Sequence, residues 1–304
     1  MLRFLTQRIL FIGLVSVFIV LIVNVGMRMV SNSNIPEPSY DLVPVTQLAW
    51  EDTKQFFSGM LRGDLGTFQR QGGTFEVIEV MQDMYIKSMG LLGVALAAAA
   101  AIGFLVGGFI ALTRHRYFIA PLLTLTILGV SIPSFFGGFI MQRTVAYYKD
   151  DYEFLRKLTL VGFDWDFRHM FLPVLVLSAR PLAYLTRSAF ISLEHVMKED
   201  FIRTAHAKGL RERWIVLDHA FRNIAVPVLT TLGVSLRFSL SSLPVVEFLF
   251  NWPGIGLGLI TAINNRNQDL VVALAFALGI TIQLINFLLD IIYRIVDPRI
   301  REIS

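Results

Sequence analysis

The sequence predicts an all-α membrane protein with six transmembrane helices. Of its 304 residues, 55% are hydrophobic and only 16% are charged, whereas a soluble domain carries about 25% charged residues. The mean hydropathy is +0.62, and six apolar runs are close to or above the length of about 20 residues that spans a bilayer. The chain has no cysteine, which excludes a disulfide framework and a Cys-ligated metal site.

The six apolar runs are expected to form helices in chain order. They cover residues 9–27, 89–112, 117–141, 169–191, 224–249 and 270–292. The first run is too long for the apolar part of a typical signal peptide, and no small-residue cleavage site follows it, so we expect an uncleaved span. The second run is rich in Gly and Ala, which let helices approach closely in lipid. The third contains Pro133, and the fourth carries Arg180 beside Pro181.

Basic residues indicate which loops lie in the cytoplasm. Six spans place both termini on one side of the membrane with the loops 113–116 and 187–222, and that side carries a net charge of +7 against −3 on the other. Because loops rich in Lys and Arg stay inside, both termini are expected to be cytoplasmic. The chain then divides into a tail with the first span (1–30), an extracytoplasmic segment (31–84), which is either a folded cap or a structured loop, and a core of five spans (85–304).

The cytoplasmic loop contains a stretch, residues 199–210, that is typical of a short helix with a sharp end. Asp200 is a candidate N-cap, Lys208 suits the negative end of the helix, and Gly209 supplies a left-handed stop before Leu210. The small side chains of the stretch are Thr204, Ala205 and Ala207. Such a helix is expected to anchor a core poorly and to suit contact with another protein. The alternative is an amphipathic helix on the bilayer surface.

Four blocks of sequence carry a resemblance to a known family. The first is Arg203-Thr204-Ala205-x-Ala207-Lys208-Gly209, followed by His219-Ala220-x-Arg222-Asn223 and Pro227. The others are Glu247-x-x-Phe250-x-Trp252-Pro253-Gly254-x-Gly256, Asp290-x-x-Tyr293-x-x-x-Asp297-Pro298-Arg299-Ile300-Arg301, and Gly63-Asp64-Leu65-Gly66. Together they resemble ABC importer permeases, especially the branch that handles di- and oligopeptides and nickel. The general pattern begins Glu-Ala-Ala, and Arg203-Thr204 replaces its first two residues, as is common in that branch.

The resemblance implies a non-catalytic permease subunit of an ATP-driven importer for di- or oligopeptides, with residues 85–304 as the permease core. It implies a second homologous permease that completes a heterodimer, two ATPase subunits and an extracytoplasmic solute-binding protein, all at the inner membrane of a prokaryote. No cofactor is expected in this chain, because it lacks the Gly-x-x-x-x-Gly-Lys-Ser/Thr loop that holds ATP phosphates. ATP and Mg²⁺ would bind the ATPase partners, and no nucleic acid is expected.

Two sets of candidate site residues follow. The ATPase-coupling set is Asp200, Arg203, Thr204, Ala205, Ala207, Lys208, Gly209 and Leu210. The translocation-path and gate set is Arg180, Arg237, Glu247, Asn251, Trp252, Pro253 and Gly254. Charges inside spans are costly and usually face a bundle interior or a water-filled path, so Arg180 and Arg237 are expected to line the path. The alternative is a structural pair between helices. Trp252 suits the membrane interface.

An ion-coupled secondary transporter or channel that works without an ATPase is the main alternative function. Against it, the acids within the spans are only Glu247 and Asp290, both near span ends, whereas proton relays use chains of such residues. Asp290 is instead expected to pair with an arginine of the inner side. A membrane-embedded enzyme would need a nucleophile–base pair or a metal cluster in the spans. Neither is visible, and the five histidines show no ligand spacing, so no metal site is expected.

Overall fold

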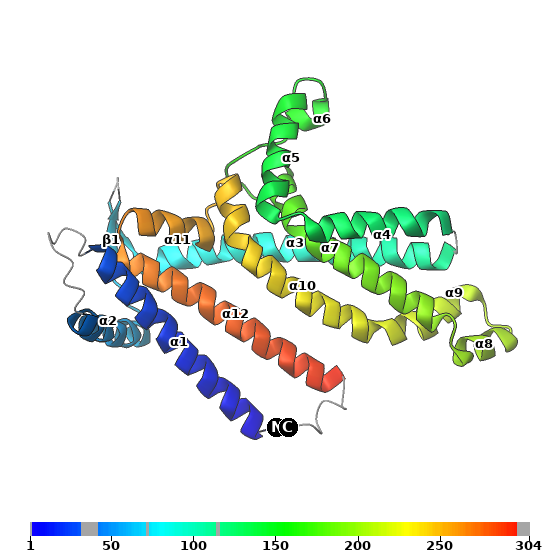
Figure 1. The fold of residues 1–304 in the computed structure, drawn as a ribbon, viewed down its shortest axis with the longest axis horizontal. Helices are drawn as coiled ribbons and strands as arrows, with labels where there is room; N and C mark the ends of the chain where they lie inside the picture. The colour runs from blue at the N-terminus through cyan, green and yellow to red at the C-terminus, as the bar shows by residue number, and fades with distance from the viewer. Residues whose placement is uncertain (1, 32–41, 71–72, 114–115, 297–304) are drawn as a thin grey trace. The chain divides into compact units, whose positions relative to one another are not determined.

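The computed structural model describes residues 2–31, 42–70, 73–113 and 116–296, which are mostly helical (Figure 1). The helices are α1 (Leu2–Ser31), α2 (Leu42–Arg62), α3 (Val77–Thr113), α4 (Arg116–Ser131), α5 (Ser134–Tyr148), α6 (Glu153–Arg156), α7 (Phe167–Val196), α8 (Asp200–Ala207), α9 (Glu212–Trp214), the π-helix η2 (Ile215–Ala220), α10 (Phe221–Phe250), α11 (Ile255–Asn264) and α12 (Gln268–Val296). The strands β1 (Thr67–Arg70) and β2 (Gly73–Glu76) form an antiparallel hairpin.

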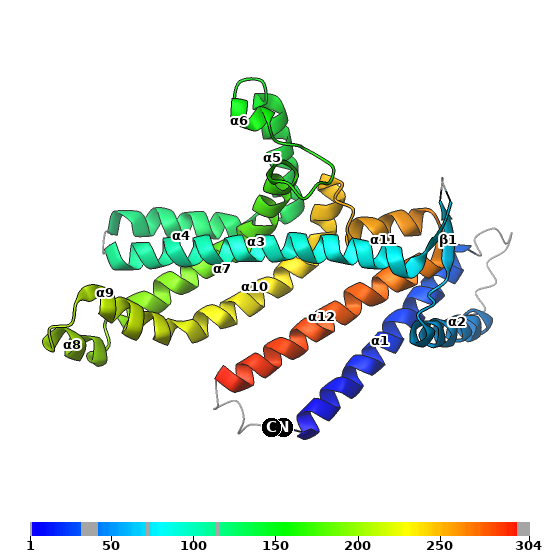
Figure 2. The same cartoon turned by 180° about the vertical axis from the view of Figure 1, so that it is seen from behind.

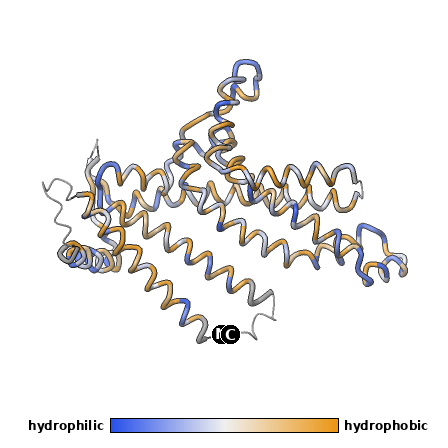
Figure 3. Tube along the Cα trace, viewed as in Figure 1, coloured by the Kyte–Doolittle hydropathy of each residue, from blue (hydrophilic) through white to orange (hydrophobic). Residues whose placement is uncertain are grey.

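Five of the described helices are long and apolar enough to cross a membrane. These candidate spans are Leu5–Val30, Val77–Thr113, Phe167–Val196, Glu212–Phe250 and Gln268–Ile292. Hydrophobic residues follow each of them along most of its length (Figure 3). Five of the six expected apolar runs lie inside these helices, which confirms a helical membrane protein. The second span begins earlier than expected, because α3 is already helical from Val77.

The third apolar run, residues 117–141, does not form one continuous helix. The chain breaks between α4 and α5, and the two helices are bent by 105°. Pro133 stands at the break in an extended conformation, with φ −61° and ψ 140°. Proline has no N–H to continue the helical hydrogen bonds, and it disfavours the helical conformation of the residue before it, here Ile132. This bend creates one wall of a cavity described below.

The chain folds into two compact units. Unit 1 combines the chain up to Met89 with Pro253–Ile292, and unit 2 is built on Gly90–Trp252. In unit 1, α1 and α12 run side by side in both views (Figures 1 and 2). An ion pair between Arg8 Nη2 and Asp290 Oδ2, at 2.5 Å, joins these two helices. The expected pairing of Asp290 with an arginine is thereby confirmed.

The described part of the predicted extracytoplasmic segment consists of α2, the hairpin and the start of α3. Gly63 ends α2 in a left-handed conformation with φ +76°, and the amide of Asp64 donates to the Gly59 carbonyl. The carboxylate of Asp64 then accepts from the amide of Gly66, whose φ is +88°. The Gly63–Gly66 block therefore makes the turn that leads from α2 into the hairpin.

Close helix packing organises unit 2. A Cβ added at Gly107 of α3 would lie 2.3 Å from the backbone oxygen of Thr186 in α7, and one at Gly103 would lie 3.1 Å from the Thr186 nitrogen. Glycine is therefore required where these two backbones meet, as is common between membrane helices. α7 in turn packs along α10, so α7 is the central helix of the unit. It ends at the loop that carries α8.

Candidate functional site

The short helix α8 has the predicted position and a sharply defined end. Leu210 N–H donates to the Ala205 carbonyl at 3.3 Å, and Gly209 N–H donates to the His206 carbonyl at 2.9 Å. With Gly209 at φ +74°, these bonds form a Schellman stop, which satisfies carbonyls that a helix end leaves free. The predicted stop at Gly209 is confirmed.

The beginning of α8 differs from the prediction. Glu199 is the N-cap residue by its extended backbone, and Asp200 is the first helical residue, so the assignment of Asp200 as N-cap is wrong by one position. The Asp200 carboxylate instead accepts a hydrogen bond from Arg203 Nη1 at 3.1 Å. A negative charge in the first turn suits the positive end of the helix dipole.

One face of α8 is anchored in the apolar interior of unit 2. Ile202 is 1% exposed and Ala205 is 6% exposed. They pack in one cluster with Leu193 of α7, Ile215 of η2 and Ile224 of α10. The expectation that this helix anchors a core poorly is therefore wrong. Because Ala205 points into the chain's own interior, α8 is mechanically connected to the ends of two spanning helices.

The opposite face of α8 is exposed and polar. Its exposed members are Asp200, Arg203, Thr204, Ala207 and Lys208. The Thr204 hydroxyl donates to the Asp200 carbonyl within the helix. The Thr204 and Ala207 side chains are small, so they project only a short distance from the helix. His206 Nε2 lies 2.8 Å from Glu212 Oε2, which ties α8 to α9. The structure thus presents a compact, rigid surface of mixed charge.

Sequence reasoning missed most of the apolar side chains that are exposed within and after α8. Phe201 and Leu210 are each 42% exposed, Trp214 is 49% exposed and Leu217 is 55% exposed. Only Leu210 was in the predicted set. The available signal was the occurrence of large apolar residues within a loop rich in charge. Leu217 lies in η2, and single π-helical turns are frequent at functional sites.

At the other end of α10, the block around Trp252 forms a second tight stop. Asn251 adopts φ +51°, and Trp252 N–H donates to the Glu247 carbonyl at 2.8 Å. The Trp252 side chain is fully buried. Its ring centroid lies 4.8 Å from that of Phe163 and 5.6 Å from that of Trp165, both edge to face. The Trp252 ring therefore packs against aromatic side chains of the chain itself.

Glu247 is also enclosed by the chain. Its side chain is fully buried, so it does not line an open path within unit 2, contrary to its predicted place in the path set. Gln142 of α5 secures the same region, because its Nε2 donates to the carbonyls of Leu249 and Leu160 at 3.0 and 3.2 Å. Gly162 N–H adds a bond to the Phe250 carbonyl at 2.9 Å. The loop before α7 is thus tied to the end of α10.

In unit 1, the rest of this block starts α11. Gly254 is the N-cap residue of α11, and the hydroxyl of Ser88 accepts a hydrogen bond from Ile255 N–H at 2.7 Å. Pro253 lines a cavity of about 480 Å³ together with Met84 of α3. Within the block Asn251–Gly254, only Asn251 is exposed, while Pro253 is half-buried.

The two arginines inside the spans have different surroundings. Arg180 of α7 lines a cavity of about 450 Å³ at the bend between α4 and α5. Its Nη2 donates to the Val130 carbonyl at 3.2 Å, and its guanidinium carbon lies 5.5 Å from the centre of the Phe238 ring. Arg237 of α10 is exposed, and no carboxylate of the described chain lies within ion-pair distance of it. Among the described residues, the guanidinium groups of Arg180 and Arg237 share no hydrogen-bond or ion-pair partner.

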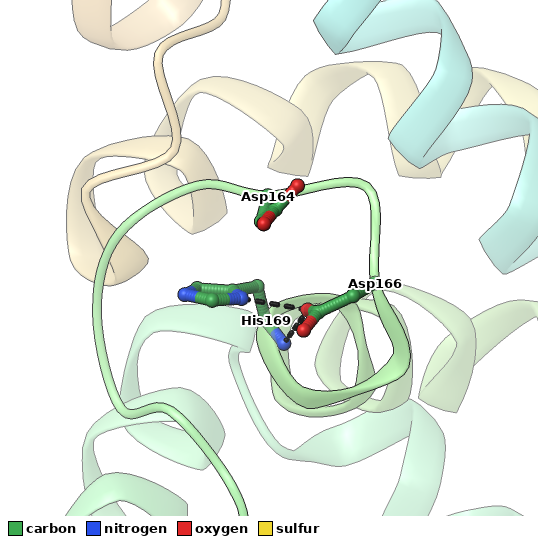
Figure 4. Close-up of side chains that lie close together, drawn as sticks. All are labelled: Asp164, Asp166 and His169. Atoms are coloured by element: carbon green, nitrogen blue, oxygen red, sulfur yellow. Dashed lines mark hydrogen bonds and ion pairs between the residues drawn. The ribbon is translucent and has the colours of Figure 1, made fainter.

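A cluster of metal-binding residue types lies in the loop before α7 and in the first turn of that helix (Figure 4). The carboxylates of Asp164 and Asp166 and the ring of His169 place ligand atoms within 4.8 Å of one another. Asp166 Oδ1 accepts from His169 N–H at 2.9 Å and lies 2.6 Å from His169 Nδ1. The backbone hydrogen bond from His169 is the main reason that the pKa of Asp166 is lowered. Capping of α7 by Asp166 therefore accounts for this contact, which the histidine spacing in the sequence did not reveal.

Comparison with known proteins supplies independent information. Residues 76–302 match the family model described as binding-protein-dependent transport system inner membrane component. A glutathione transport system permease protein of Salmonella choleraesuis is 32% identical over 81% of this chain and 78% of its own length. A dipeptide transport system permease protein of Escherichia coli K12 is 31% identical over 83% of this chain and 81% of its own length. A peptide permease protein of Brucella suis biovar 1 is 30% identical over 85% of this chain and 80% of its own length.

Proposed function

Because this chain belongs to the family of binding-protein-dependent transport system inner membrane components, we propose that it is the transmembrane permease subunit of an ATP-driven importer for di- or oligopeptides. It is a multi-pass protein of the inner membrane and a non-catalytic component of its transport system. The proposed substrate class rests on the relatives, whose names specify peptides, dipeptides and glutathione. The described helices supply the membrane-spanning body that this function needs.

The finer topology belongs to the same proposal. Both termini lie in the cytoplasm, residues 31–84 lie outside, and the permease core is 85–304 with the cytoplasmic loop 187–222. The bent pair α4 and α5 is then the sixth span. The net charge of +7 on the proposed inner side supports this orientation. The tail motif Asp297–Arg301 lies outside the described residues.

The exposed face of α8 is proposed as the contact with an ATPase subunit. The observation that carries this proposal is the division of α8 into an exposed polar face and a buried face that packs on α7, η2 and α10. A rigid helix of this kind can pass movement of a docked ATPase to two spanning helices. A second homologous permease would bring a second such helix, so that two ATPase subunits drive the pair. An extracytoplasmic solute-binding protein would deliver the peptide.

The path and gate residues are proposed with revised roles. Arg180 and Arg237 line the translocation path, because uncompensated charges within spans are stable only beside water, solute or a partner. Asn251, Pro253 and Gly254 form the outer turn that follows α10. Glu247 and Trp252 hold that turn from inside the fold, since both side chains are buried. Gate motion would then involve the turn and not these two side chains individually.

The first test is affinity purification of the tagged chain from mild detergent, followed by an ATPase assay of the eluate. We expect an ATPase and a second permease to copurify and the eluate to hydrolyse ATP. A single chain with no partner and no ATPase activity would contradict the proposal and favour an ion-coupled transporter.

A paired variant tests α8 itself. Arg203→Glu with Lys208→Glu reverses two charges on the exposed face, and we expect ATPase recovery to fall about tenfold, the effect of losing roughly 1.4 kcal/mol of binding. Lys198→Glu is the matched control, because Lys198 is exposed in the same loop but pairs with Glu194 outside α8. Equal recovery from both variants would remove α8 from the interface. Ala205→Glu is unsuitable, because it would place a charge in the interior.

A further inference from the structure

The cavity at the bend between α4 and α5 has an unusual combination of linings. It has a volume of about 450 Å³ and is lined by side chains of α4, α5 and α7, all within unit 2. Apart from Ser134, Thr144 and Arg180, its walls are apolar side chains and glycines. A volume of several hundred Å³ is typical of small-molecule sites. Arg180 is the one charged residue among its described lining residues.

The guanidinium group of Arg180 is incompletely satisfied. It has five N–H donors, and Nη2 uses one for the carbonyl of Val130, which belongs to the last turn of α4. Nε is buried and has no acceptor among the described residues. The contact with the Phe238 ring stabilises the positive charge but accepts no conventional hydrogen bond. A buried donor without an acceptor is costly, so an acceptor that draws the guanidinium toward the cavity would be stabilising.

The chemistry of the cavity selects one kind of acceptor. No acidic side chain is among its described lining residues, and a guanidinium group matches the two oxygens of a carboxylate in a planar fork. The apolar walls suit an apolar group attached to that carboxylate. A multiply charged anion would find only one cation here and would lose its hydration.

We propose that Arg180 binds the carboxylate of a small solute with an apolar body, such as the C-terminal carboxylate of a peptide, in the cavity at the α4–α5 bend. The proposal rests on the proposed function for the identity of the solute, but the recognition chemistry follows from this cavity. Arg180 would then be a specificity residue within the membrane, distinct from any selection by a solute-binding protein.

The test compares two probes on the purified complex without a solute-binding protein. N-acetyl-L-phenylalanine carries the carboxylate, and N-acetyl-L-phenylalanine amide lacks it but keeps the same apolar body. Binding is measured by saturation-transfer difference NMR titration in detergent. We expect the wild-type complex to bind the acid about tenfold more tightly than the amide, a difference that corresponds to roughly 1.4 kcal/mol. Equal binding of acid and amide, or no binding of either, would overturn the proposal.

Variants test whether Arg180 causes the preference for the acid over the amide. Arg180→Gln should reduce binding of the acid to the level of the amide, and Arg180→Lys should keep a smaller preference, because it retains charge but not the planar fork. Arg143→Gln is the matched control, because Arg143 also lies over an aromatic ring, that of Phe139 at 5.3 Å, but does not line this cavity. A full preference in Arg180→Gln, or its loss in Arg143→Gln, would refute the assignment. If a variant does not fold, the comparison of acid and amide binding by the wild-type complex still tests the proposal.

Uptake of a dipeptide by the complete transporter, measured separately, distinguishes the two proposals. Absence of uptake with the acid preference intact would contradict the importer function alone. Normal uptake without any acid preference would contradict the role of Arg180 alone. A carboxylate from the second permease that already occupies the guanidinium would abolish probe binding in the wild type and would therefore count against the proposal.

Discussion

At the scale of single residues, the same local geometry ends three helices. Gly63, Gly209 and Asn251 have φ values of +76°, +74° and +51°. The amide one position further along donates in each case to a carbonyl five residues earlier: Asp64 to Gly59, Leu210 to Ala205, and Trp252 to Glu247. Left-handed residues allow this bond because the chain reverses within one residue. The direction of each following segment is therefore fixed by one backbone conformation.

Gly107 provides a residue-level test of helix packing. Gly107→Ala would place a Cβ 2.3 Å from the Thr186 backbone oxygen, so α3 and α7 must separate, and we expect a loss of stability of about 1–3 kcal/mol. The measurement is the melting temperature in detergent. Gly108→Ala is the matched control, because its Cβ would have no neighbour closer than 3.9 Å and it gains the same helix propensity. Equal melting temperatures for both variants would contradict the close α3–α7 contact.

Asp52 provides a test of pH dependence. Arg28 donates two hydrogen bonds to its carboxylate at 2.5 and 2.7 Å, and this bonding, aided by Gln268, lowers the pKa of Asp52. A lowered folded-state pKa contributes stability above the unfolded pKa of about 4, and that stability is lost as the pH falls through the folded value. We therefore expect acid to destabilise unit 1 and Asp52→Asn to weaken this dependence.

The measurement for Asp52 is the melting temperature from pH 7 down to pH 3. Glu51→Gln is the control, because Glu51 belongs to an exposed pair with Lys54, and such pairs contribute little. A wild-type protein and Asp52→Asn variant with parallel pH profiles would show that the Arg28–Asp52 pair does not govern acid stability.

At the scale of elements, the proposed coupling depends on helices that are joined at their ends. α8 is held by Ile202 and Ala205 against the ends of α7 and α10, and α5 is held against the end of α10 by Gln142. The same helix α10 is therefore fixed at both ends within unit 2. A displacement of α8 can reach the outer turn through one continuous helix, provided that both attachments hold.

A substitution at Gln142 tests the attachment of α5 to the end of α10. Gln142→Leu removes hydrogen bonds to two carbonyls, each worth about 1 kcal/mol, and we expect faster hydrogen exchange at the amide of Gly162, which bonds to the Phe250 carbonyl. The measurement is hydrogen–deuterium exchange of residues 158–163. Arg143→Gln, at the neighbouring position, should leave this exchange unchanged. Unchanged exchange in Gln142→Leu would mean that the loop is held by other contacts.

At the scale of the whole molecule, the orientation in the membrane decides which face meets which partner. The chain contains no cysteine, so a single introduced cysteine reports its own location. We expect Lys54→Cys to react with a membrane-impermeant maleimide in intact cells. Lys198→Cys should react only after the membrane is permeabilised, because its loop is proposed to be cytoplasmic. Labelling of Lys198→Cys in intact cells would reverse the proposed topology.

Much of the architecture was accessible from sequence because it rests on local properties. Hydropathy along the chain located five long helices, and the left-handed stop at Gly209 followed from the residue type itself. Pro133 was visible inside the third apolar run, yet a 105° bend was not predicted. Proline disrupts a helix locally, but the angle of the break depends on what both helices pack against.

The sequence by itself determined the membrane class, the family resemblance and the position of α8. Only the tertiary structure decided that Ala205 faces inward, that Trp252 is buried against Phe163 and Trp165, and that Arg180 lines a cavity. The physical reason is that hydropathy and backbone preference act between near neighbours in the chain. Burial and cavities arise from contacts between segments that are distant in sequence, and no local pattern records which segments meet.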